Sequence, residues 1–177
     1  MGTVRADAER NRARILEAAA RLFADHGAPD VTMDDIAKAA GVGRGTLYRR
    51  YPDRAAIATA LLDEHERVLQ SALMSGPPPL GPGAPPADRL AAFYEAMIGL
   101  LSAHAHLVLA TETGHSRFTT GAYSFWRVHL ATLGVTPARL DVLLAPLAPD
   151  VYTFQRSQGL TDADIVESLR TLARAVL

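Results

Sequence analysis

The stretch from Thr32 to Arg54 constrains the fold of this chain more than any other. It reads T-M-D-D-I-A-K-A-A-G-V-G-R-G-T-L-Y-R-R-Y-P-D-R. Thr32 is a favourable N-cap, and Asp35, three residues later, can reach back to the Thr32 amide and complete a capping box. Gly41 follows two turns later and suits the left-handed position that ends a helix. The stretch therefore predicts a short helix that begins after Thr32 and ends before Gly41.

A second short helix is expected directly after this turn. Gly43 is an acceptable but weak N-cap, and the helix must end by Tyr51 because Pro52 disfavours helical geometry in the residue before it. Leu47 marks the buried side, and the other faces carry three arginines, a hydroxyl, a phenol and a glycine. Such a helix suits the DNA major groove, where arginine pairs bidentately with guanine and smaller groups meet phosphate.

At these residues the sequence resembles the TetR family of bacterial transcriptional regulators, whose signature looks like T-x-x-x-I-A-x-x-A-G-V-S-x-G-T-L-Y-x-x-F-x-x-K. The chain departs from it where Gly43 replaces serine, Tyr51 replaces phenylalanine and Arg54 replaces lysine. Arg54 keeps a phosphate-binding cation, and a glycine cap costs only a few tenths of a kcal/mol. The matched positions are Thr32, Ile36, Ala37, Ala40, Gly41, Val42, Gly45, Thr46, Leu47 and Tyr48.

The helix-turn-helix hypothesis carries a set of expected DNA contacts. Four arginines and one acid lie in the second helix and the turn after it, so the local field is positive. Leu47 and Tyr51 are expected in the core, and Lys38 on a solvated face. Arg50 is either solvated or, as the resemblance implies, in contact with phosphate. The expected DNA-binding residues are Thr32, Arg44, Gly45, Thr46, Tyr48, Arg49, Arg50 and Arg54.

Composition describes a globular chain. Of 177 residues, 49% are apolar and 21% charged, and none is cysteine. No run approaches a membrane span and the start has no apolar signal region, so the protein is expected in the cytoplasm. Residues 1–56 hold ten Lys or Arg against eight acids, whereas residues 57–177 hold eight against eleven. This modest asymmetry favours DNA contact by the first part alone.

The chain is expected to divide into a helix-turn-helix DNA-binding domain, residues 1–53, and a helical regulatory and dimerisation domain, residues 54–177. Residues 1–9 read as a mobile leader before a helix that ends at Gly27. Asp53 caps a fourth helix that runs to about Leu73. Its expected buried positions are Ile57, Ala60, Leu61, Val68 and Leu69. The Pro/Gly-rich residues 75–87 read as a semi-rigid spacer, with recognition by a proline-binding domain as the lesser alternative.

The rest of the chain continues the helical pattern. One helix is expected from Asp88 to about residue 101, and a shorter one around residues 107–109 before Gly114. Further helices are expected from Thr120, from Pro137 behind a Thr136 cap, from Pro149 to Gly159, and behind a capping box of Thr161 with Asp164. No segment alternates convincingly with period two. The predicted fold is all-α, a three-helix helix-turn-helix domain followed by a helical bundle.

Two leucine-rich faces near the C-terminus need partners. The TetR resemblance implies a homodimer whose interface is formed by the last two long helices of each subunit, which fits DNA reading at two half-sites. The alternative is that both faces simply close the core of one subunit. The expected interface residues are Leu140, Leu143, Leu144, Leu147, Ile165, Leu169, Leu172 and Val176.

Aromatic and polar groups mix between residues 94 and 129, and they can line a mostly apolar pocket with a few polar anchors. An aromatic stripe at helical spacing is also what an ordinary core contains. The candidate ligand-binding residues are Tyr94, Met97, His104, Phe118, Tyr123, Trp126, Arg127 and His129. His104 and His106 point to opposite sides of a helix and lack a carboxylate at ligand spacing, so they are interpreted as solvated loop histidines. No metal or cofactor is expected.

The function expected from the resemblance is a transcriptional repressor that leaves a palindromic DNA operator when a small-molecule effector binds the second domain. The alternative is a DNA-binding architectural protein without such a switch. A cavity of a few hundred Å³ would favour the regulator and a filled core the architectural protein. An enzyme is the least favoured class, because the serines lack a nucleophile-elbow context and the G-V-G-R-G run has no preceding strand.

Overall fold

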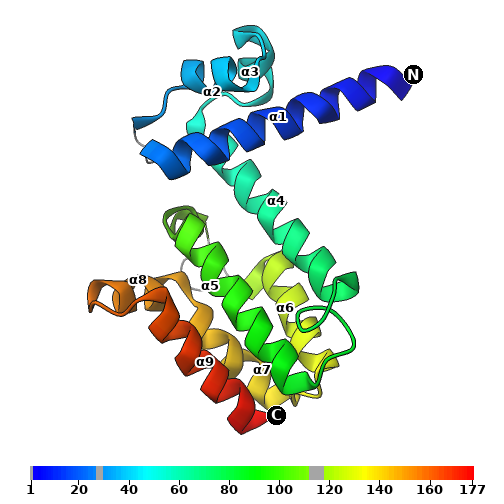
Figure 1. The fold of residues 1–177 in the computed structure, drawn as a ribbon, viewed down its shortest axis with the longest axis vertical. Helices are drawn as coiled ribbons and strands as arrows, with labels where there is room; N and C mark the ends of the chain where they lie inside the picture. The colour runs from blue at the N-terminus through cyan, green and yellow to red at the C-terminus, as the bar shows by residue number, and fades with distance from the viewer. Residues whose placement is uncertain (1, 27–29, 112–117) are drawn as a thin grey trace. The chain divides into compact units, whose positions relative to one another are not determined.

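The computed structural model describes the backbone of residues 2–26, 30–111 and 118–177, and side chains within 6–26, 30–104 and 118–177. Every regular element in these ranges is a helix (Figure 1), so the predicted all-α fold is confirmed. The chain forms two compact units, Met1–Glu64 and His65–Leu177, called unit 1 and unit 2 below. Among the described residues, no helix is long and apolar enough to cross a membrane.

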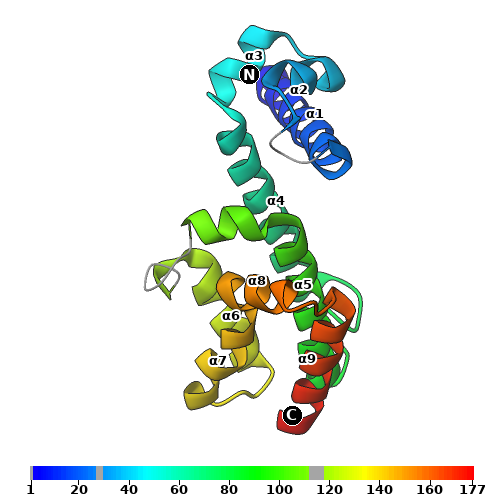
Figure 2. The ribbon, with the colours of Figure 1, turned by 90° about the vertical axis from the view of Figure 1, so that its left-hand side faces the viewer.

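Unit 1 contains α1 (Gly2–His26), α2 (Met33–Ala40), α3 (Arg44–Arg50) and the first half of α4 (Arg54–Ser75). Figures 1 and 2 show α2 and α3 on one side of α1. The four helices share one apolar core, because each contributes side chains that are almost fully buried. These include Ile15 and Ala19 of α1, Ile36 of α2, Leu47 of α3, and Ile57 and Leu61 of α4.

Since α4 supplies Ile57 and Leu61 to this core, the packing of unit 1 extends to Glu64. The sequence placed the functional boundary between residues 53 and 54. That boundary stays a prediction about function, while packing divides the chain within α4.

The structure corrects the prediction for the start of the chain. Residues 1–9 were expected as a mobile leader, but α1 already begins at Gly2. The segment from Thr3 to Asp25 contains neither glycine nor proline, so nothing in it interrupts a helix. Arg10 and Asp7, three residues apart on the exposed surface, form an ion pair that supports the added turns. The predicted stop at Gly27 lies outside the described residues.

The predicted helix ends around the turn are confirmed. The Asp35 amide donates to Thr32 Oγ1 (3.2 Å) and the Thr32 amide donates to Asp35 Oδ2 (3.0 Å), which completes the capping box. These hydrogen bonds from Thr32 lower the pKa of Asp35. Gly41 has φ 60° and ψ 40°, a left-handed conformation in which any other residue is strained. Arg14 Nη2 donates to the Gly41 carbonyl oxygen (3.1 Å) and so ties this turn to α1.

Unit 2 is a helical bundle around α5 (Pro86–Thr111), which packs against α8 (Pro149–Ser157) and α9 (Asp162–Val176). Figure 1 shows α5 and α9 running side by side. The remaining elements are α6 (Gly121–Thr132), α7 (Pro137–Leu144) and the short 3-10 helix η3 (Ala145–Leu147). The most completely buried side chains of unit 2 include Leu73, Leu90, Phe93, Tyr94, Ile98, Leu101 and Leu130.

Three predictions for unit 2 are wrong. Residues 107–109 do not form a separate helix, because α5 continues without a break to Thr111. Val68 was expected to be buried, but it is 55% exposed and lines an open groove with Leu80 of the following loop and Ala96 of α5. The Pro/Gly-rich segment is a folded loop and not a spacer: the buried Gly81 donates its amide to the Pro77 carbonyl (2.9 Å). A Cβ on Gly81 would overlap the carbonyl oxygen of Gly76, so the glycines allow this close backbone approach.

Candidate functional site

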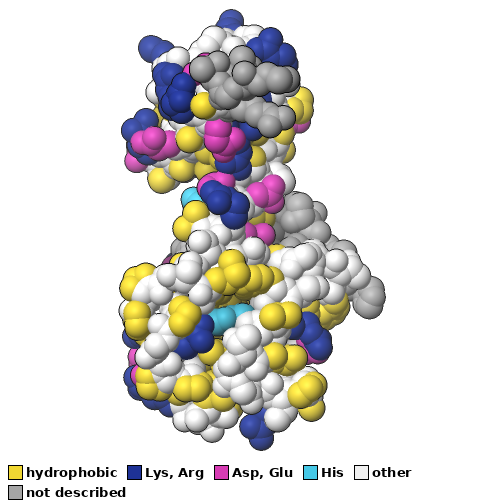
Figure 3. Space-filling view, turned by 90° about the vertical axis from the view of Figure 1, so that its right-hand side faces the viewer, with side chains coloured by type: hydrophobic (Ala, Val, Ile, Leu, Met, Phe, Trp, Pro, Cys, Tyr) yellow, Lys and Arg dark blue, Asp and Glu magenta, His cyan; other side chains and the backbone are white. Residues whose placement is uncertain are grey.

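The α3 helix is anchored by one side and exposed on the others. Leu47 has 0% of its surface exposed and Tyr51, just after the helix, has 6%. Tyr48 is 48% exposed. The other exposed residues on the predicted DNA surface are Thr32, Arg44, Gly45, Arg49, Arg50 and Arg54, and Thr46 is half-buried. The residues expected at DNA are therefore accessible to solvent apart from the half-buried Thr46, and Figure 3 shows Lys and Arg side chains at several places over unit 1.

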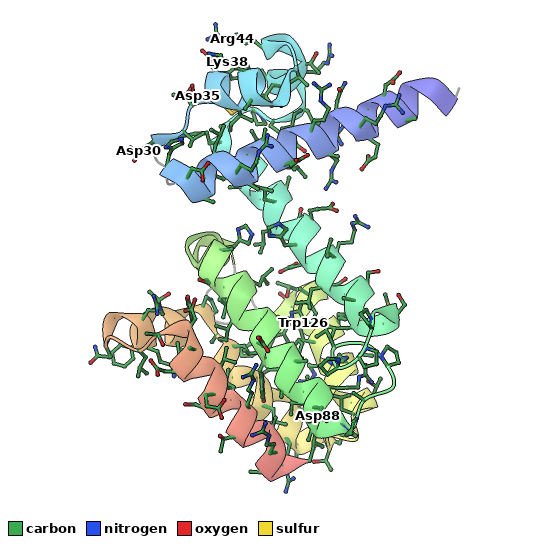
Figure 4. The ribbon with its side chains drawn as sticks, in the orientation of Figure 1. Asp30, Asp35, Lys38, Arg44, Asp88 and Trp126 are labelled. Carbon is green, nitrogen blue, oxygen red and sulfur yellow. The ribbon has the colours of Figure 1, made fainter. Side chains whose placement is uncertain are left out.

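Arg44 opens α3 and forms an ion pair with Asp34 of α2. The Arg44 side chain is 70% exposed and the Asp34 side chain 44%, and Figure 4 shows Arg44 and Lys38 extending outward from unit 1. An exposed ion pair contributes at most about 1 kcal/mol to stability, because water screens the attraction. Asp34 therefore orients the Arg44 guanidinium without holding it strongly, and a guanine edge can replace the carboxylate.

Arg54 has a structural contact that the sequence did not reveal. Its Nη1 donates to the Val31 carbonyl oxygen (2.8 Å), so the first residue of α4 is tied to the residue before the α2 cap. A guanidinium has five N–H donors, so this bond leaves the phosphate contact possible. Arg50 lies with its Cζ 6.0 Å from the centroid of the Tyr51 ring. Contacts of Arg50 and Arg54 with phosphate stay predictions.

Gly45 is the one glycine of α3, so no side chain covers the backbone there and DNA could approach it closely. A Cβ added there would meet no atom within 4 Å, so the folded protein has room for alanine. We expect Gly45→Ala to stabilise unit 1 by about 0.5–1 kcal/mol, because glycine is a poor helix former, and yet to weaken DNA binding. Urea denaturation and DNA titration of the same preparations test both effects.

Gly99→Ala is the matched control, since Gly99 lies within α5 of unit 2 and also has no atom within 4 Å of an added Cβ. It should gain similar stability without any change in DNA affinity. Unchanged DNA affinity in Gly45→Ala would show that the backbone at Gly45 does not approach DNA.

Unit 2 contains an apolar cavity between three helices and one connecting segment. Its walls come from α4, α5, α6 and the segment that joins α7 to α8. It encloses about 590 Å³ of empty space when its open mouth is included, but only about 50 Å³ can hold the centre of a water molecule. The smaller of these two volumes decides how large a ligand can fit, and it is less than the volume of a site for a drug-sized ligand. The lining residues are Glu66, Met97, Leu100, Leu101, Tyr123, Trp126, Leu144, Ala145, Leu147, Ala148 and Pro149.

Three of the eight candidate ligand residues, Met97, Tyr123 and Trp126, line this cavity. Tyr94 is instead a core residue: it is fully buried, and its hydroxyl donates to the Leu143 carbonyl oxygen (3.0 Å). Burial raises the pKa of the Tyr94 phenol. Phe118 packs edge-on against the Tyr123 ring, with centroids 5.1 Å apart, and so supports a lining residue from outside.

The polar candidates are engaged elsewhere. Arg127 Nη1 donates to both carboxylate oxygens of Asp141 (2.6 Å each), an exposed pair between α6 and α7. His129 is 5% exposed and packs against the Phe93 ring, with centroids 5.2 Å apart. Its Nε2 has no hydrogen-bond partner, and burial, with a smaller contribution from the charge of Arg89, lowers the pKa of His129 to about 4.

The interpretation of His104 as a solvated loop histidine is wrong. His104 lies within α5 and is 7% exposed, because α5 extends beyond the predicted helix end. Its Nε2 lies 2.6 Å from Nδ1 of His65 on α4, so the two imidazoles join these helices. The side chain of His106 lies outside the described residues. Among the residues whose side chains are described, no group of three or more His, Cys, Asp or Glu can hold a metal ion.

Comparisons with known proteins identify the helix-turn-helix unit. Residues 15–61 match the model for bacterial regulatory proteins of the tetR family. Over 74 residues, 42% of this chain, the sequence is 42% identical to the HTH-type transcriptional repressor LfrR of Mycolicibacterium smegmatis. The helix-turn-helix part of this chain, residues 15–61, belongs to the TetR family. It is also 48% identical over 52 residues, 29% of this chain, to an uncharacterised HTH-type transcriptional regulator of Mycobacterium tuberculosis.

These sequence matches span 38% of LfrR and 28% of the Mycobacterium tuberculosis regulator. Solved structures extend the likeness to the whole TetR-family fold. A putative TetR-family regulator from Rhodococcus sp. has a TM-score of 0.65 at 18% identity, covering 95% of this chain and 98% of that one. LfrR from Mycobacterium smegmatis in complex with proflavine has a TM-score of 0.57 at 23% identity, covering 96% and 97%. At these identities the structures establish the fold alone.

The leucines expected at a dimer interface are mostly buried within this TetR-family subunit. Leu140, Leu143, Ile165 and Leu169 have at most 6% of their surface exposed. Leu144 and Leu147 are also buried and line the cavity, while Leu172 and Val176 are half-buried. Side chains that are already buried leave little surface for a partner. This favours the alternative that they close the subunit core, and the dimer interface itself stays a prediction.

Most of the residues that line the cavity were not predictable from the sequence. Leu100, Ala145, Ala148 and Pro149 give no sequence signal, because only the packing of α5 against the α7–α8 segment brings them together. Glu66 does give one. It lies four residues after Leu62 and three before Leu69, which are both buried, so a carboxylate occupies the apolar face of α4.

Proposed function

We propose that this chain is a sequence-specific DNA-binding transcriptional repressor that leaves its operator when a small molecule occupies the unit 2 cavity. The observation that carries the proposal is α3: an exposed, arginine-bearing helix fixed by the buried Leu47 within a TetR-family helix-turn-helix unit. One relative, LfrR, is a transcriptional repressor, and its crystal structure was solved in complex with proflavine. Both properties support the same assignment here.

The reading step uses Arg44. On DNA its guanidinium exchanges the Asp34 carboxylate for the O6 and N7 acceptors of a guanine, which is the commonest specific arginine contact. Thr46, Tyr48, Arg49 and Arg50 surround it and meet phosphates or base edges. A homodimer, acting in the cytoplasm, places two such helices on half-sites about 34 Å apart. Exposed apolar side chains on and beside α8, among them Val151, Phe154 and Leu160, are available for the dimer contact.

The switching step uses α4. This helix contributes Ile57 and Leu61 to the core of unit 1 and Glu66 to the cavity of unit 2. A ligand that moves α4 at residue 66 therefore acts on the helix that also supports α3. DNA and ligand then oppose each other by linkage, since each favours a different position of α4.

A second function, DNA binding without a small-molecule switch, is favoured by one observation. Only about 50 Å³ of the cavity can hold the centre of a water molecule, so the cavity is nearly filled by the surrounding side chains in this conformation. The two functions differ in one measurement. An effector that binds the repressor must lower its DNA affinity, whereas an architectural protein keeps its DNA affinity with every bound compound.

Arg44→Ala tests the DNA-reading function. We expect it to weaken binding to the cognate duplex by about 1–3 kcal/mol and to relax base preference at one position, because a bidentate contact to guanine is lost. Titrations of cognate and scrambled duplexes at two salt concentrations measure the effect. Arg139→Ala, an exposed arginine of α7, is the control and should change neither binding nor its salt dependence. Equal losses on both duplexes for Arg44→Ala would exclude base reading by Arg44.

A further inference from the structure

A carboxylate lies on the surface that the proposed function assigns to DNA. Asp34 is the second residue of α2, and both of its carboxylate oxygens contact Arg44: Nε donates to Oδ1, and Nη2 pairs with Oδ2. DNA carries one negative charge per roughly 1.7 Å of its axis, so it repels a carboxylate at its surface. The ion pair is exposed and adds little to folding. Asp34 therefore opposes DNA binding unless it meets a hydrogen-bond donor on the DNA.

The backbone presents Asp34 from a fixed position. The next residue, Asp35, closes the capping box with Thr32. Met33 before Asp34 is 8% exposed, and Ile36 after it is 0% exposed. The first turn of α2 is thus held at its cap and at its buried face, while the Asp34 side chain is 44% exposed. A polar side chain on such a turn reaches a ligand in a defined direction, which base recognition requires.

The ion pair determines which part of the DNA Asp34 meets. Its two oxygens occupy the N–H groups of Arg44 that the N7 and O6 acceptors of guanine take in the proposed complex. When guanine replaces the carboxylate, Asp34 moves aside but stays in the major groove beside that guanine. The next base pair lies about 3.4 Å further along the axis, and it is the nearest place for the released carboxylate.

The chemistry of the bases selects one partner there. In the major groove guanine presents two acceptors, thymine an acceptor and a methyl group, and adenine an acceptor beside its donor. Cytosine alone presents a donor, the N4 amino group, without a neighbouring acceptor that repels a carboxylate. We propose that Asp34 is a second base-reading residue, which accepts a hydrogen bond from N4 of a cytosine in the base pair next to the guanine read by Arg44. The inference rests on the proposed function, because it adds a contact to the same DNA surface.

The test uses a substitution that should switch the preferred base. Asparagine has the same shape as aspartate, but it pairs with N6 and N7 of adenine. Asp34→Asn should therefore replace cytosine by adenine beside the guanine whose preference Arg44→Ala relaxes. Bound duplexes are selected from a random pool by the full chain of wild type, Asp34→Asn and the control Glu17→Gln. Glu17 is an exposed α1 carboxylate paired with Arg21, so its substitution changes the net charge equally, outside α2 and α3.

Titration of two duplexes, with cytosine or adenine at that position, gives a ratio of affinities for each variant. We expect wild type and Glu17→Gln to prefer the cytosine duplex, and the ratio of cytosine to adenine affinity to fall at least about tenfold in Asp34→Asn. Both duplexes are measured on the same preparation, so partial unfolding of a variant cancels from the ratio.

A smaller fall in this ratio, an equal fall in Glu17→Gln, or a base other than cytosine selected by wild type overturns the inference. Failure of the proposed function looks different, because the wild-type chain then enriches no sequence and both proposals fall. If wild type enriches a palindrome and Asp34→Asn enriches the same one, DNA reading stands and the role of Asp34 is refuted.

Discussion

Replacing Leu47 with alanine destabilises unit 1 by about 3–5 kcal/mol and abolishes specific DNA binding. Leu47 is fully buried and is the one residue of α3 in the shared core with Ile15 and Ile36. Truncation removes buried apolar surface and leaves a cavity, and leucine-to-alanine changes in cores have this cost. A helix of seven residues has no stability of its own, so α3 loses its position when this contact is lost.

Two signals measured in the same urea titration show which unit is destabilised by Leu47→Ala. Trp126 is the only tryptophan of the chain and lies in unit 2, so its fluorescence reports that unit, while circular dichroism reports all helices. Leu47→Ala should lose part of its helical signal at low urea, with the Trp126 transition unchanged. Met74→Ala, at a methionine that is 62% exposed, is the control and should be nearly neutral. A loss below about 1 kcal/mol in Leu47→Ala would contradict the assigned core role.

Acid destabilises unit 2 through His129. Burial is the main cause that lowers its pKa from 6.5 to about 4 in the folded chain. The unfolded chain therefore binds the proton first as pH falls. This stabilising contribution is complete above pH 6.5 and is lost as pH falls from 6.5 to about 4. At about 1.4 kcal/mol per pKa unit, the loss is about 3 kcal/mol in total and about 2 kcal/mol between pH 7 and pH 5.

Urea denaturation followed by Trp126 fluorescence at pH 7 and pH 5 measures this loss. His129→Leu removes the titrating group and should reduce the pH dependence by that amount, while His26→Gln, at the exposed end of α1, should leave it unchanged. The result is the difference in pH dependence between the variant and wild type. Equal pH dependence in wild type and His129→Leu would show that His129 is solvated.

The helix-turn-helix was predictable because its determinants are local. Thr32 and Asp35 are three residues apart, and the left-handed Gly41 ends the same helix, so cap, turn and stop appear in sequence order. The start of the chain was mispredicted for a related reason: nothing in residues 3–25 stops a helix, and the absence of a breaker carried more information than the polar composition.

The helical nature of unit 2 was predictable from the sequence, but the residues that line its cavity were not. Met97, Tyr123 and Trp126 line the cavity, whereas Tyr94 and His129 belong to the core and His104 pairs with His65 across 39 positions of sequence. Ligand contact by the three lining residues stays a prediction. Helical periodicity shows that a residue is buried, but it does not distinguish a core from a cavity wall. That distinction depends on which distant segment packs opposite, and here η3 does so.

The most direct test of the central claim is the selection of bound duplexes from a random pool by the purified chain, followed by mass determination of the complex. A regulator of this family should enrich a palindrome with half-site centres about 34 Å apart, or a multiple of that distance, bound by an even number of subunits. Binding that enriches no sequence and simply fades as salt rises would contradict specific DNA recognition by α3.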